Sequence, residues 1–124
     1  MTIFDQLAKQ IDETADRDAD QAKKSIVKFA EYVLRDKFGQ RITVQPFQAH
    51  MLQAMEEHRF VVLEAARGFG KSTYGCLILP LWRLMHNRDL RIMIVTQSDG
   101  LAKHWLREME TIMASAPFQK IAGN

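Results

Sequence analysis

The chain has 124 residues, of which 47% are hydrophobic and 26% charged, and its formal net charge is +2. This composition is typical of one globular domain with a moderate core; it argues against disorder, and the charge gives no basis for nucleic-acid binding. The single cysteine excludes an intramolecular disulfide, and there is neither a signal peptide nor an apolar run of membrane-spanning length, so we expect a cytoplasmic protein.

Residues 1–39 are predicted to form a helical N-terminal appendage. Apolar residues from Ile3 to Ile11 recur at helical spacing, and the charged segment 12–20 either extends this helix or connects it to the next. A second helix is predicted from Gln21 to Phe38, and Gly39 is expected to end it in the C′ position. Its apolar stripe consists of Ile26, Phe29, Ala30, Val33, Leu34 and Phe38.

Residues 40–124 show an alternation of helical and strand patterns. A helix is expected to begin near Pro46, whose missing N–H costs nothing in a first turn. The run "FVVLEA" (60–65) predicts a buried strand, and "STYGCLILPLWRLMHN" (72–87) a buried helix that Pro80 kinks. A second strand is predicted over 90–97, and a helix after it with Ser98 or Asp99 as N-cap. Residues 116–124 have no periodicity.

This order of elements predicts an α/β fold of the P-loop NTPase type. Strands that alternate with helices form parallel sheets with helices on their faces. With two strands predicted, the sheet would be incomplete.

A glycine-rich segment, "EAARGFGKST" (64–73), lies between the first strand and the helix. Gly68 and Gly70 permit a backbone that curls around a phosphate, and the N-terminus of the following helix adds N–H donors. In the GxxxxGK[ST] pattern, Lys71 reaches the β- and γ-phosphates of ATP and Ser72 holds Mg²⁺, while Thr73 is placed for the α-phosphate. Ala66 and Phe69 complete the predicted loop. Ala65 stands where the pattern has its first glycine, so a purely structural turn remains the alternative.

The stretch "FVVLEAARGFGKST" resembles the phosphate-binding loop of the large subunit of tailed-phage terminases, the motors that pump DNA into capsids. That family often replaces the first glycine and has an arginine in the position of Arg67, which would neutralise charge in the transition state and so serve catalysis with Lys71. "PFQ" (46–48) resembles its adenine-contacting motif and assigns that role to Gln48, with Gln45 as a second candidate. "LRIMIVTQSDGLAKHWLREM" resembles the next strand and helix, so the resemblance covers about residues 41–124.

The resemblance makes residues 40–124 the first part of an ATPase domain. It also implies double-stranded DNA, a terminase small subunit and a portal as partners, and an oligomeric ring for the complete protein. The acidic pair that completes the family's ATPase site is not found here: Asp99 is better interpreted as a helix cap, and the nuclease carboxylates are also missing. The chain therefore predicts ATP binding without motor-like hydrolysis.

Three other classes share parts of this pattern. Small-molecule kinases carry a similar loop, but they begin close to it. A superfamily 2 helicase fragment shares the upstream glutamine and the loop, although it lacks an arginine in the position of Arg67. A truncated module that binds nucleotide without turnover is the third.

Overall fold

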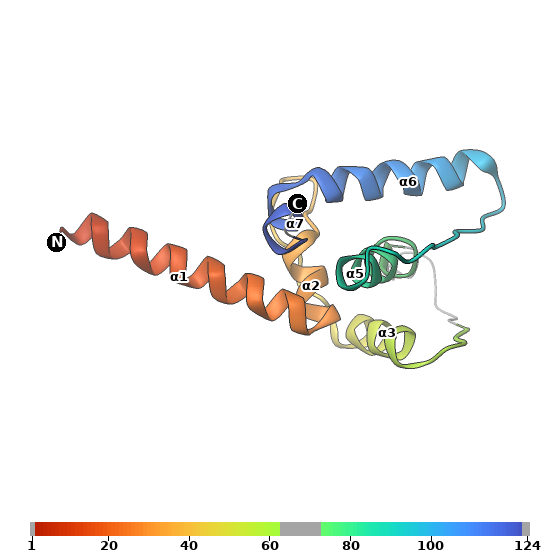
Figure 1. Cartoon of the computed structure of the whole chain (residues 1–124), viewed down its shortest axis with the longest axis horizontal. Coiled ribbons are helices and arrows are strands. Elements are labelled where there is room, and N and C mark those ends of the chain that lie inside the picture. The colour runs from red at the N-terminus through yellow and green to blue at the C-terminus, as the bar shows by residue number, and fades with distance from the viewer. Residues whose placement is uncertain (1, 63–72, 123–124) are drawn as a thin grey trace.

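The computed structural model describes residues 2–62 and 73–122, and within them the regular structure is helical. Figure 1 shows a body of packed helices from which the N-terminal helix extends outward. In chain order the elements are α1 (Ile3–Lys24), α2 (Ile26–Val33), α3 (Pro46–Glu57), the π-helical turn η1 (Tyr74–Ile78), α5 (Leu79–His86), α6 (Asp99–Ala114) and α7 (Ala116–Ala122).

The predicted α/β fold with a parallel sheet is wrong, because the described residues form no strand or sheet. Residues 60–62 and 90–96 have no regular structure, while 63–65 lie outside the described residues. In the part of the chain that the structure describes, β-type pairing is limited to an isolated antiparallel bridge between Arg35 and Arg41. An apolar run becomes a strand only when a neighbour pairs with its backbone and covers its faces. Val62 and Val95, which are 87% and 81% exposed, lack that cover.

Helix α2 forms the centre of the core. Its Phe29 and Ala30 are completely buried, and α1, α3, η1, α5 and α7 all pack against it. The ring of Phe29 lies 5.5 Å from that of Trp82 in α5 and 6.3 Å from that of Phe118 in α7, measured between centroids. The apolar stripe recognised in the sequence thus holds together helices that are far apart along the chain.

The first helix is longer than its apolar pattern indicates, and the second starts later. α1 continues through the charged segment 12–20 and ends at Lys24, so the first of the two alternatives for that segment is correct. Ser25 separates the two helices. Its backbone is extended, and its hydroxyl accepts a hydrogen bond from the backbone N–H of Lys28 at 3.4 Å, which caps α2 at Ile26.

The end of α2 also differs from the prediction, because the helix stops at Val33 and not at Phe38. The carboxylate of Asp36 accepts hydrogen bonds from the backbone N–H groups of Phe38 (2.8 Å) and Gln40 (3.0 Å). An aspartate that binds nearby amides in this way competes with the helix and favours a turn. Gly39 lies in that turn with φ +79°, so its special conformation serves the turn and not a helix end.

Two prolines begin helical segments. Pro46 occupies the first turn of α3 as predicted, and that helix buries Met51, Leu52 and Met55. The segment predicted as one kinked helix begins instead as the wider π-helical turn η1, in which the N–H of Leu79 bonds to the carbonyl of Tyr74, five residues back. Pro80 follows in the first turn of α5. A proline supplies no N–H and crowds the preceding turn, which is consistent with the wider turn just before it.

The C-terminal part contains one helix that was expected and one that was not. Ser98 caps α6 by accepting from the N–H of Leu101 at 3.2 Å, which decides between the two predicted caps. Residues 116–122, for which the sequence shows no periodicity, form α7 and bury Phe118 and Ile121. Among the described helices, none is both long and apolar enough to cross a membrane.

Candidate functional site

Most of the predicted nucleotide-binding residues lie outside the described residues. These are Ala66, Arg67, Gly68, Phe69, Gly70, Lys71 and Ser72. The two that the structure describes are Gln48, in the first turn of α3, and Thr73, directly before η1. The contacts around these two residues form the described part of the candidate site.

Gln48 is joined to the residue that follows Thr73. The hydroxyl of Tyr74 donates a hydrogen bond to Gln48 Oε1 at 3.1 Å, across 26 positions of the sequence. The same oxygen accepts from the backbone N–H of Gln45 at 3.0 Å, which stabilises the beginning of α3. The segment that the resemblance assigns to adenine thus lies beside the residue that directly follows the phosphate-loop sequence.

Tyr74 is buried where α3 meets η1. It is 3% exposed, and burial raises the pKa of its phenol, with the negative charge of Glu31 adding to the effect. Met55 of α3 packs nearby: a Cβ built on Gly75 would lie 3.8 Å from its sulfur. The junction between α3 and η1 is therefore a packed contact that links Gln48 to Tyr74, the residue directly after Thr73.

The hydrogen bonds of Gln48 bear on its predicted role. An amide oxygen has two lone pairs, and here it accepts from two protein donors. To accept also from the amino group of adenine, Gln48 would have to give up one of these bonds. In this structure its oxygen serves to fix α3 and η1.

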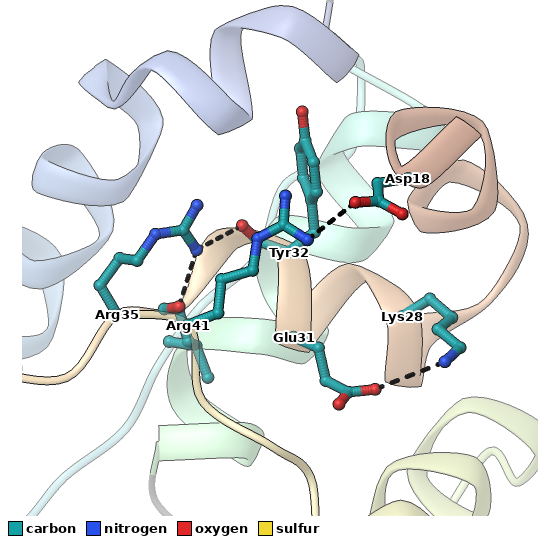
Figure 2. A network of polar contacts seen from close by, with 7 residues as sticks. Asp18, Lys28, Glu31, Tyr32, Arg35 and Arg41 are labelled. Carbon is teal, nitrogen blue, oxygen red and sulfur yellow. Dashed lines mark hydrogen bonds and ion pairs between the residues drawn. The ribbon is translucent and has the colours of Figure 1, made fainter. Parts of the chain in front are cut away.

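Two arginines, Arg35 and Arg41, lie side by side beyond the end of α2, and sequence reasoning did not single them out (Figure 2). Arg35 Nη1 donates to the backbone carbonyls of Tyr32 (2.6 Å) and Leu34 (2.9 Å). Arg41 pairs with Asp18 at 3.0 Å, and its guanidinium lies 5.2 Å from the centre of the Tyr32 ring. Burial, followed by repulsion from Arg41, lowers the pKa of Arg35 below its ordinary value. The charge of Arg41 is thus paired with Asp18, whereas none of the ion pairs formed within the described residues involves Arg35.

The described residues include no group of three or more side chains placed to hold a metal ion. Asp99, the nearest acidic candidate in the sequence, lies in the first turn of α6 and forms an exposed ion pair with Lys103 at 3.0 Å. The predicted Mg²⁺ ligand Ser72 lies outside the described residues. Cys76 is half-buried, and burial raises the pKa of its thiol.

Comparison with known proteins adds no relative to these observations. No family model, curated protein or solved structure matches the chain.

Proposed function

We propose that this chain binds ATP with Mg²⁺ through residues 66–73, as the nucleotide-binding segment of a DNA-packaging motor of the terminase type. The residues that carry this proposal are a lysine and two hydroxyls directly after paired glycines. Lys71 would contact the β- and γ-phosphates, Ser72 would hold Mg²⁺, and Thr73 would donate to the α-phosphate. Arg67 would lie beside the γ-phosphate, where its charge stabilises the transition state of hydrolysis in the complete motor.

One observation in the structure supports the proposal most directly. The hydrogen bond from Tyr74 to Gln48 joins the segment that the resemblance assigns to adenine to the residue that directly follows the phosphate-loop sequence. Gln48 and Tyr74 are 26 positions apart along the chain, so their contact follows from the fold and not from local sequence. Such a contact is expected if both segments belong to one binding site.

The proposed activity of this chain is binding and not turnover, because no apolar run of its sequence is followed directly by an acidic pair that would position Mg²⁺ and water. DNA, the small subunit and the portal are proposed partners of the complete motor and rest on the resemblance alone.

The test is the affinity of the chain for ATP·Mg²⁺, measured by titration calorimetry. Lys71→Ala should abolish binding, because it removes the mobile positive charge that the loop directs at the phosphates. Lys9→Ala is the matched control: Lys9 is exposed on α1, and its loss removes the same charge elsewhere. Equal affinity of the Lys71→Ala and Lys9→Ala proteins would contradict the proposal. Removal of Mg²⁺ by a chelator should weaken binding in the wild-type and Lys9→Ala proteins.

Arg67→Ala tests whether Arg67 binds ATP in the ground state or stabilises the transition state of hydrolysis. This variant should keep most of the affinity for ATP, since the arginine acts when the γ-phosphoryl group leaves. A loss of affinity as large as that of Lys71→Ala would make Arg67 a ground-state ligand.

A further inference from the structure

A cleft of about 490 Å³ opens beside Thr73. The end of α2 forms one wall and α6 forms another, and Thr73 and Leu77 lie between them. Thr73 already has helical backbone angles (φ −59°, ψ −48°), and its hydroxyl makes no capping hydrogen bond. Since Thr73 directly follows Ser72, the cleft begins where the phosphate-loop sequence ends.

The lining of this cleft is partly apolar and partly aromatic. Val33, Leu34 and Leu77 line it and are buried. Trp105 is half-buried at its side, and the ring of His104 lies edge-on to that of Trp105 with centroids 5.0 Å apart. Ligand pockets of roughly 300–1,000 Å³ are commonly lined in this way, with a few polar groups for orientation. A lining of aromatic and apolar side chains suits a planar, uncharged ring.

The polar groups of the cleft match the rest of a nucleoside that carries phosphate. Arg35 lines the cleft, and none of the ion pairs formed within the described residues involves it. Its guanidinium is held by the carbonyls of Tyr32 and Leu34, so its position is fixed in advance. Glu108 lines the cleft one helical turn after His104, and a carboxylate can accept from the hydroxyls of a ribose.

We infer that this cleft binds the base and ribose of a purine nucleotide whose phosphates lie toward Thr73. The base stacks on Trp105, Glu108 accepts from the ribose hydroxyls, and Arg35 faces the negative charge of the phosphates. This assignment rests on the proposed function and specifies where the nucleoside lies. It differs from the expectation that Gln48 reads the base, because the oxygen of Gln48 already accepts from two protein donors.

The lowered pKa of Arg35 agrees with this placement. Burial and repulsion from Arg41 both disfavour its charged form, and an anion in the cleft would reverse that effect.

The experiment compares ATP·Mg²⁺ with inorganic tripolyphosphate and Mg²⁺, both by calorimetry on the full chain. Tripolyphosphate has the phosphates without the nucleoside, so it reports on the loop alone. Stacking of a base on an aromatic side chain is worth about 1–3 kcal/mol, so wild-type chain should bind ATP roughly 5- to 150-fold more tightly than tripolyphosphate.

A blocking variant and a matched control locate the nucleoside. Thr111 is exposed on α6 and lines the cleft, so Thr111→Trp should fill the space that the base needs. It should lower the affinity for ATP to that for tripolyphosphate and leave tripolyphosphate binding unchanged. Glu110→Trp adds the same bulk at the neighbouring exposed position, which does not line this cleft, and should leave both affinities unchanged. Helical circular dichroism of both variants reports whether the fold is retained.

Trp105→Ala provides a second measure that needs no added bulk. It should weaken ATP binding by the same range of about 5- to 150-fold and spare tripolyphosphate.

The outcomes separate this inference from the function on which it rests. If tripolyphosphate binding depends on Lys71 but Thr111→Trp and Glu110→Trp bind ATP equally, the inference fails and the proposed function stands. If Gln48→Ala alone lowers ATP to the level of tripolyphosphate, the base lies at Gln48 and the inference also fails. If neither probe binds in a Lys71-dependent way, both are overturned.

Discussion

Replacement of Phe29 by leucine should lower the free energy of unfolding by about 1–3 kcal/mol. The ring of Phe29 is completely buried and lies against the rings of Trp82 and Phe118. Leucine keeps much of the apolar volume but loses both ring–ring contacts, each of which contributes about 0.5–1.5 kcal/mol beyond its buried area. Alanine would also leave a cavity and should cost about 3–5 kcal/mol, a large part of the roughly 5–15 kcal/mol of a whole domain.

The measurement is urea unfolding followed by circular dichroism at 222 nm. Phe38→Leu is the control, because Phe38 belongs to the same predicted stripe but is 76% exposed. Its free energy of unfolding should stay within about 0.5 kcal/mol of wild type. If Phe29→Leu falls within that same limit, or if Phe38→Leu costs as much as Phe29→Leu, then α2 does not hold α5 and α7 together and the core described above is wrong. If Phe29→Ala does not fold, the comparison of Phe29→Leu with Phe38→Leu still tests the role of α2 in the core.

Three other outcomes follow from single residues. Tyr74 should ionise above the ordinary tyrosine pKa of 10.0 in a titration of absorbance at 295 nm, and Tyr74→Phe should remove that late step. The raised pKa favours the protonated phenol in the fold, so its contribution to stability is present below pH 10.0 and is lost as the pH rises through the raised value. Cys76, the one thiol of the chain, should react with a disulfide reagent much faster in urea than in buffer, because burial raises its pKa; equal rates would show that it is exposed. Gly39→Ala should cost about 1 kcal/mol in urea unfolding through its positive φ alone, since an added Cβ has no atom within 4 Å; a cost near zero would contradict the turn.

Local signals in the sequence predicted parts of the fold well. Pro46 at the start of α3 is correct, and of the two predicted caps of α6 the structure has Ser98, while Asp99 lies in the first turn; such signals act within one turn of chain. The end of α2 was mispredicted because the apolar stripe continues to Phe38, whereas the side chain of Asp36 turns the chain earlier. Helix α7 was missed because seven residues are too few for a periodic pattern, although Phe118 and Ile121 have helical spacing.

The sheet could not be judged from the apolar runs themselves. A run such as 90–95 fits a strand or an exposed connection equally well, and the difference depends on whether distant segments pair with it. Sequence patterns predicted Gln48 and Thr73 as residues of the candidate site. The place of Arg35 in the cleft, in contrast, depends on where α2 ends and how α6 packs. No pattern near Arg35 predicts that.

Helix α1 has consequences for how stability is distributed along the chain. Every residue from Thr2 to Thr14 is exposed, whereas Ala19 and Ala22 are buried against the body and Asp16 and Asp18 form ion pairs with it. The outer half is stabilised by its own backbone and by the reciprocal cap between Thr2 and Asp5. Amide protons should therefore exchange with solvent quickly near Ile3 and more slowly toward Lys24, where opening requires the core to separate. A single helix thus spans the range from independent fraying at its tip to the cooperative unfolding of the body at its base.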